Sequence, residues 1–316
     1  MRISDLGGEF KLIERLARPA RNPDVLCGIG DDAAVIRTVE GMQIITTDML
    51  VEGDHFSLRY FAPRQIGIKA MESNVSDIAA MGGEPRYTLI SLALTEETEV
   101  ELVDGMYEGI YEVADKYGFD VIGGDTTHGP RMVLNVTLIG TAQEERLCLR
   151  SHARPGDRIF VSGPLGGSTA GLMLFLKEVA AFEAVKRRHT EPSARMDISR
   201  IIAPYVHAME DVSDGLASEV KNICRASACG AVIHAEQVPI LDEVHKAAEA
   251  VSADALDFAL FGGEDFELVY TVPEEYAETV PGTLVGEIRD QEGVFLRTAG
   301  KETLIERSGY DHFAGA

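Results

Sequence analysis

The sequence is short of basic residues and has no long apolar run. Its 29 Lys and Arg residues are outnumbered by 52 Asp and Glu residues, which gives a formal net charge of −23. Nucleic acids and anionic membranes both attract clustered basic side chains, so this charge excludes both as expected partners. No apolar run approaches the roughly 20 residues of a membrane-spanning helix. The first ten residues lack the apolar segment of a signal peptide, so we expect a cytoplasmic protein.

Several common functional motifs are also absent. The four cysteines are scattered, and without a Cys-x-x-Cys pair they are expected to be reduced, buried bystanders rather than zinc or redox ligands. The sequence contains no Gly-x-x-x-x-Gly-Lys-Ser/Thr loop, no protein-kinase His-Arg-Asp or Asp-Phe-Gly motif, and no EF-hand loop. The absence of the first two kinds of motif excludes the two commonest ATP-binding frameworks, the P-loop and the protein-kinase fold. The four cysteines mentioned above are Cys27, Cys148, Cys224 and Cys229.

The 316 residues, 45% of them hydrophobic, are enough for two domains with an α/β fold. A polar stretch at 141–157 predicts a boundary that gives domains 1–145 and 146–316, with room for a ligand cleft between them. Periodicity predicts strands at 43–47, 87–94, 132–140, 158–162 and 267–272. It predicts helices at 63–81, at 99–117 with Gly118 as C-cap, at 168–182 and around Leu216–Cys224, and a solvated helix face at 186–189.

Several aspartates lie beside glycine or within apolar stretches, where a charge is costly unless it is paired or bound to metal. Asp48 follows an apolar strand, so we expect it at a strand end, although it could instead cap its own turn. Asp77 lies in a predicted helix, where a cation is the simplest way to offset burial of its charge. Gly124 would let a turning backbone approach a ligand beside Asp125.

The segment at 211–215, DVSDG, precedes a predicted helix. Ser213 or Asp214 is expected to be the N-cap of this helix. The cap accounts for one of the two carboxylates and leaves the other without a structural role. Helix N-termini also bind phosphate. Oxygen ligands without Cys or His favour Mg²⁺, which commonly bridges carboxylates to substrate phosphates. The pattern therefore predicts Mg²⁺-dependent phosphoryl transfer.

Seven motifs in this order resemble the thiamine-monophosphate kinase family, and they span nearly the whole chain. They are GIGDDA (28–33), TTDMLVEGDHF (46–56), NVSDIAAMG (74–82), GGDTTHGP (123–130), DVSDGL (211–216), FGGEDFEL (261–268) and GYDHF (309–313). This family is related to aminoimidazole-ribotide synthetase and selenophosphate synthetase. The resemblance implies two PurM-like α/β domains, a homodimer whose N-terminal strands share a barrel, and an ATP cleft between the domains. It also implies transfer of the ATP γ-phosphate to thiamine monophosphate, the last step in making thiamine diphosphate.

The resemblance implies roles for residues in these motifs, with no protein nucleophile because the acceptor phosphate attacks directly. Metal ligands would be Asp32, Thr46, Thr47, Asp48, Asp77, Asp125, Asp211 and Asp214. Residues contacting ATP would be Tyr107, Gly124, Asp125, Arg150 and Ser213, and those holding thiamine monophosphate would be His55, Glu264 and Tyr310. Alternatives remain open: Tyr111 competes with Tyr107, and Arg150 could be an ordinary linker residue. A different acceptor, or binding of nucleotide without catalysis, is the rival function.

Overall fold

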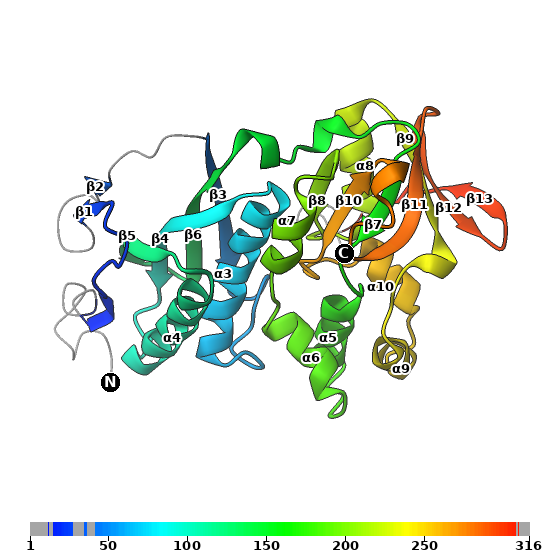
Figure 1. The fold of residues 1–316 in the computed structure, drawn as a ribbon. Coiled ribbons are helices and arrows are strands. Elements are labelled where there is room, and N and C mark those ends of the chain that lie inside the picture. Colours follow the sequence, from blue (N-terminus) through cyan, green and yellow to red (C-terminus); the bar gives the residue numbers. More distant parts are fainter. Residues whose placement is uncertain (1–11, 13–14, 28–34, 37–41, 308, 310–316) are drawn as a thin grey trace. The chain divides into compact units, whose positions relative to one another are not determined.

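The computed structural model describes residues 12, 15–27, 35–36, 42–307 and 309, and it divides into two compact units (Figure 1). The first unit comprises Met1–Ile78 and Gly83–Glu144, and the second comprises Ala79–Gly82 and Glu145–Ala316. Each unit combines a mixed sheet with helices, which confirms the predicted α/β class. No described helix is both long and apolar enough to cross a membrane.

The first unit is built on a four-stranded sheet in the order β3-β6-β4-β5, in which only β4 and β5 run parallel (Figure 1). Its helix-covered face is buried at residues such as Val136 and Ile90. On the opposite face, Ile45 and Met49 are 65% and 53% exposed. The elements are β1 (Val25–Cys27), β2 (Val35–Ile36), β3 (Met42–Val51), α3 (Pro63–Ala80), β4 (Glu84–Leu94), α4 (Val100–Tyr117), β5 (Asp120–His128) and β6 (Val133–Ala142).

Helices α3 and α4 touch through two glycines. A Cβ at Gly67 would lie 2.0 Å from Met106 O, and a Cβ at Gly109 would lie 2.0 Å from Arg64 O. The two backbones can approach this closely only because neither position carries a side chain. The α4 helix buries its predicted apolar stripe and ends at Gly118, whose φ of 78° confirms the predicted C-cap.

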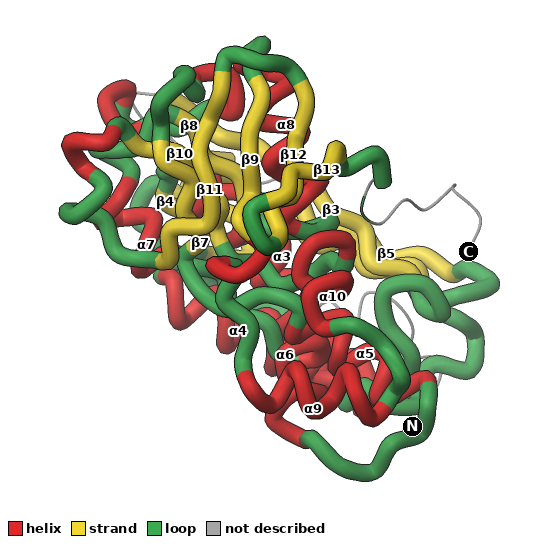
Figure 2. Tube along the Cα trace, turned by 90° about the vertical axis from the view of Figure 1, so that its right-hand side faces the viewer, coloured by secondary structure: helices red, strands yellow, loops and turns green. Residues whose placement is uncertain are grey.

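The second unit is built on a seven-stranded sheet in the order β13-β12-β9-β11-β7-β10-β8 (Figure 2). Only β9 and β12 run parallel, and α8 packs on the sheet across the main core. Helices α5, α6 and α9 contribute to a second, smaller core. The elements are β7 (Arg158–Val161), α5 (Gly167–Leu176), α6 (Glu183–Thr190), α7 (Met196–Ile202), β8 (Ala208–Asp211), α8 (Leu216–Ser227), β9 (Gly230–His234), α9 (Asp242–Ala250), α10 (Ala255–Phe261), β10 (Leu268–Val272), β11 (Thr283–Arg289), β12 (Gly293–Thr298) and β13 (Lys301–Leu304).

Two predictions for the helices α5 and α6 are wrong. The helix predicted at 168–182 ends at Leu176, because the chain turns at Glu178, whose φ is 53°. The helix face predicted to be solvated at 186–189 is partly buried, since Lys186 is 8% and His189 only 2% exposed. Helix α6 packs closely on α5 at a glycine position, and this contact buries one side of the polar run.

Candidate functional site

The acidic segment 211–215 lies against the segment 262–268 in the second unit. The two segments continue from β8 and β10, which are antiparallel neighbours. Beyond the strands, Glu264 N–H donates to Ser213 O at 2.7 Å. Two motifs that are distant in the sequence, DVSDG and GGEDFE, therefore form one surface of this unit.

Close backbone packing fixes how these two segments meet. A Cβ at Gly263 would lie only 2.2 Å from Ser213 O, so glycine is required for this approach. Glu264 itself adopts the left-handed region, with a φ of 64°, which is costly for a residue with a side chain. Helix α8 then begins after Gly215, which is its N-cap. The prediction that Ser213 or Asp214 occupies the cap position is wrong, because the chain needs the φ of 106° that Gly215 supplies.

The C-terminal motif reaches the same place through Gly309. Its N–H donates to Ser218 Oγ at 2.7 Å, and a Cβ at this glycine would lie 1.9 Å from Asp214 O. The chain just before Tyr310 thus rests on the acidic segment. Tyr310 and Asp32 themselves lie outside the described residues.

Two further buried acids support the acidic segment from beneath. Glu219 Oε1 accepts the N–H of Asp214 at 2.7 Å, and Asn222 Nδ2 donates to Glu210 Oε1 at 3.0 Å and to Glu219 Oε2 at 3.1 Å. Burial raises the pKa of both the Glu210 and Glu219 carboxyls, which also lie close to each other. Arg150, the predicted phosphate contact, forms an ion pair with Glu210 at 2.8 Å.

In the first unit, β3 and α3 bring together three of the predicted metal ligands. Thr46 Oγ1 donates to Asp77 Oδ2, and Asp48 lies two residues further along the same face of β3. Burial raises the pKa of the Asp48 carboxyl, while a hydrogen bond from Ser73 and the nearby His55 lower it. The prediction that Asp48 lies at a strand end is wrong, because β3 continues past it and pairs with β6 through Val51.

His55, the predicted substrate contact, follows this strand. Its Nδ1 accepts the N–H of Val51 at 3.2 Å, and its carbonyl accepts a bond from Lys69 Nζ at 3.0 Å. These contacts hold the loop after β3 against α3. His55 therefore belongs to the same cluster as Asp48.

Thr47, Gly124 and Asp125 are placed differently. Thr47 projects from the other side of β3, where its Oγ1 donates to Val136 O at 2.9 Å. Strand β5 continues through Gly124 and Asp125 to His128, so the predicted turn at this point is wrong; pairing with β4 keeps the chain extended. Gly124 is needed there because a Cβ would lie 1.8 Å from Ile90 O.

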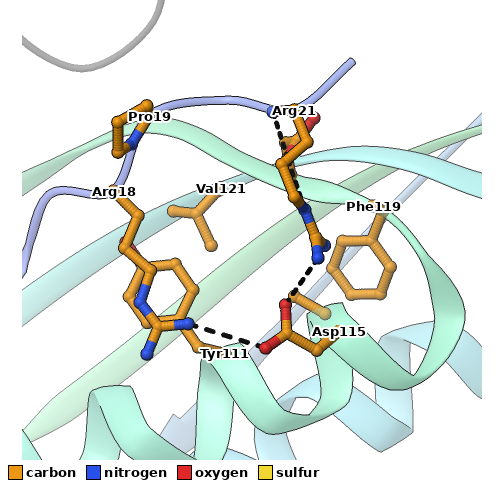
Figure 3. A pocket seen from close by; sticks show the side chains of 9 residues that line it. Arg18, Pro19, Arg21, Tyr111, Asp115, Phe119 and Val121 are labelled. Carbon is orange, nitrogen blue, oxygen red and sulfur yellow. Dashed lines mark hydrogen bonds and ion pairs between the residues drawn. The ribbon is translucent and has the colours of Figure 1, made fainter.

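Tyr111 lines a pocket of about 220 Å³ that is also lined by Arg18, Pro19 and Arg21 of the N-terminal segment 15–21 (Figure 3), and its ring centre lies 5.9 Å from that of Tyr107. The Tyr111 hydroxyl donates to Leu16 O at 2.8 Å, and the Arg18 guanidinium lies 3.9 Å from its ring centre. Tyr107 is half-buried, and burial raises the pKa of its phenol. The Tyr111 hydroxyl is thus engaged by the N-terminal segment, and the nucleotide contact of Tyr107 stays a prediction.

The donor chemistry of both clusters suits a hard divalent cation. The side chains offer carboxylate and hydroxyl oxygens, which Mg²⁺ prefers. Within the described residues, Glu210 Oε2 is a buried oxygen with no hydrogen-bond partner. No three His, Cys, Asp or Glu side chains converge on a metal position in this part of the chain. The residues thus fit Mg²⁺ by chemistry, and the predicted ligand set stays a prediction.

Comparison with known proteins decides the family. Two family models match, described as AIR synthase related protein, N-terminal domain, over residues 30–142, and its C-terminal domain over residues 154–288. A thiamine-monophosphate kinase of Bacillus subtilis (strain 168) is 39% identical, covering 96% of this chain and 99% of its own length. The chain belongs to the thiamine-monophosphate kinase family.

Solved structures of thiamine-monophosphate kinases agree with this assignment. The enzyme from Stenotrophomonas maltophilia K279a superposes with a TM-score of 0.82 at 31% identity, covering 90% of this chain and 93% of that one. A structure described as AaThiL complexed with AMPPCP and TMP gives a TM-score of 0.81 at 36% identity and covers 99% of both chains. The predicted resemblance and the PurM-like fold are confirmed.

Several residues that the sequence did not single out support one or the other of these two clusters. In the second unit, Glu219 and Asn222 hold the acidic segment, and in the first unit Ser73 bonds Asp48. The spacing of Glu219 and Asn222 on one side of a helix, directly after an acidic loop, could have indicated them. Nothing local to the sequence distinguishes Ser73.

Proposed function

We propose that this protein transfers the γ-phosphate of ATP to the phosphate of thiamine monophosphate, producing thiamine diphosphate and ADP. The observation that carries the proposal is the meeting of three motif segments, 211–215, 262–266 and the residue before Tyr310, on one surface of the second unit. Family membership supports the reaction, and the relative solved with AMPPCP and TMP supports the two kinds of ligand. The convergence of these motifs in space is what a shared ligand site requires.

The proposed Mg²⁺ ligands are the residues that the resemblance implies. Thr46, Asp48 and Asp77 already lie on one face of β3 and α3, and Asp211 and Asp214 frame the acidic segment. Bound Mg²⁺ would supply positive charge that neutralises the phosphates of both substrates. A chain with a net charge of −23 needs such cations to hold ATP at all. Asp32, Thr47 and Asp125 complete the proposed set.

In this reaction the protein residues position the two substrates. The acceptor phosphate is already ionised at neutral pH, so it attacks the γ-phosphorus in line without a protein nucleophile or strong base. Ser213, Gly124, Asp125, Arg150 and Tyr107 would hold the nucleotide. Arg150 is paired with Glu210 in this structure, and its exposed guanidinium would have to exchange that partner for phosphate.

The second substrate would be held by His55, Glu264 and Tyr310. The Glu264 carboxylate is 29% exposed, so a ligand can reach it. A carboxylate and an aromatic ring are complementary to the cationic thiazolium of thiamine.

We further propose a cytoplasmic homodimer with domains at 1–145 and 146–316. The four-stranded and seven-stranded sheets are both open, and the face of the four-stranded sheet that carries Ile45 and Met49 is left exposed. Exposed apolar side chains on a sheet face favour burial against a partner, and a second copy would supply the same surface. The shared barrel is the geometry that the family resemblance implies.

The test is to incubate purified protein with ATP, Mg²⁺ and thiamine monophosphate, with and without a chelator, and to separate the products by chromatography. Chelator-sensitive thiamine diphosphate is the expected result. Consumption of ATP with another phosphorylated acceptor, but not this one, would point to a different enzyme of the superfamily. Tight nucleotide binding with no turnover of any acceptor would favour a binding protein.

A further inference from the structure

The carboxylate of Glu264 lies beside a buried histidine. His189, on α6, is 2% exposed, and its Nδ1 lies 3.4 Å from Glu264 Oε2. The same Nδ1 lies 3.2 Å from Ser168 Oγ, near the start of α5. The imidazole thus sits where α5, α6 and the 262–266 loop meet.

The neighbouring residue anchors the same loop to the same helix. Asp265 accepts the N–H groups of Gly166 at 2.6 Å and Ser168 at 3.0 Å, so it closes the N-terminal end of α5. Ser168 therefore contacts both of these anchors, through its N–H to Asp265 and through its hydroxyl to His189. Two consecutive acids, one facing the helix end and one facing the histidine, tie the loop to α5 and α6.

The backbone of Glu264 is strained, so the contacts around it are needed to keep its conformation. A φ of 64° is uncommon for a residue with a side chain and persists only where surrounding contacts hold it. The Glu264 N–H is fixed by Ser213 O, and its carboxylate is directed toward His189. A side chain with several rotatable bonds loses considerable entropy when it is fixed, so a preset carboxylate saves that cost when a ligand binds.

We propose that His189 is a positioning residue for Glu264, holding its carboxylate in the orientation that binds the cationic part of thiamine monophosphate. His189 is buried and does not itself touch the ligand. The role rests on the proposed function of Glu264 and goes beyond it by naming the side chain that orients this acid. Binding of ATP does not depend on His189.

The experiment compares His189→Ala, His189→Asn and His207→Ala with the unsubstituted protein. The asparagine amide can place a donor near the position of Nδ1, so it tests rescue of the contact. His207 is the matched control, because its Nδ1 also bonds a carboxylate, Asp157 Oδ2 at 2.9 Å, on another part of the same unit. KM for each substrate and kcat are measured, together with Tm and calorimetric binding of thiamine monophosphate without ATP.

We expect His189→Ala to raise KM and Kd for thiamine monophosphate about three- to tenfold with KM for ATP unchanged, the size expected for loss of one ordinary polar contact. His189→Asn should restore most of this loss, and His207→Ala should show none of it. In a Glu264→Ala background, His189→Ala should add little, because the two residues act as one unit.

Three results would overturn the inference. One is an equal rise in both KM values, another is a fall in Tm with binding unchanged, and the third is full additivity of the two alanine substitutions. Failure of the proposed function is a separate outcome, seen as no thiamine diphosphate from the unsubstituted protein. Calorimetry then still decides whether His189 supports binding through Glu264.

Discussion

Gly263→Ala tests whether the meeting of the two loops in the second unit is essential. The added Cβ would lie 2.2 Å from Ser213 O, well inside contact distance, and backbone atoms cannot rotate away as a side chain can. The loops must separate by about 1 Å, which costs about 1 to 3 kcal/mol as overpacking. Separation also breaks the bond from Glu264 N–H to Ser213 O, worth about 1 kcal/mol.

We therefore expect the free energy of unfolding to fall by about 2 to 4 kcal/mol and kcat/KM to fall about 100-fold, since a displacement of about 1 Å at a site has that effect. Urea unfolding and the thiamine diphosphate assay measure the two quantities. Gly129→Ala is the control, because its nearest contact would be the Ala93 side chain at 3.3 Å. An alanine at 263 that costs no more than the control would refute the account of how these loops meet.

Other predictions follow from the remaining features. Asp48→Asn and Asp125→Asn should each abolish thiamine diphosphate formation while Tm changes little; normal turnover in either would remove that residue from the site. Ile45→Glu should convert a dimer to monomers in analytical ultracentrifugation, and an unchanged mass would contradict a dimer formed through this sheet face. Burial raises the pKa of the Cys148 thiol to about 12 from a usual 9.0, so the unfolded chain loses this proton first and stability should fall as pH rises from 9.0 toward 12. A Cys148→Ala variant should show a smaller fall; an identical pH dependence of unfolding would exclude this thiol as its source.

The sequence predicted individual elements better than it predicted their ends. Helix α4 and its glycine C-cap follow from local periodicity, and the structure confirms them. Asp48 and Asp125 were misplaced because pairing between strands distant in the sequence extends β3 and β5 past them. Local polarity at these positions cannot reveal such pairing.

Site residues could be predicted from the sequence where they belong to a local motif, and could not be predicted where their position depends on tertiary packing. The acidic segment and the GGED motif follow from the local sequence, in which acids stand beside glycines, and from the family resemblance, but their contact with each other does not. The sequence predicts a solvated His189, because this residue follows three basic residues. Its burial results from the approach of α6 to Gly171, a tertiary contact that no local pattern reports.

The glycine contact between α3 and α4 also fixes the position of Asp77 along the axis of α3. A shift of α3 by one residue would bring Ile66 or Ile68 to the position of Gly67, against the carbonyl of Met106. No rotamer change could absorb that collision, so α3 cannot slide along its axis. Asp77 lies further along the same helix, and its position relative to Thr46 is therefore set by a glycine that is ten residues away from it. The two glycines therefore fix how far along its axis α3 lies, and with it the position of the proposed metal ligand Asp77 beside β3.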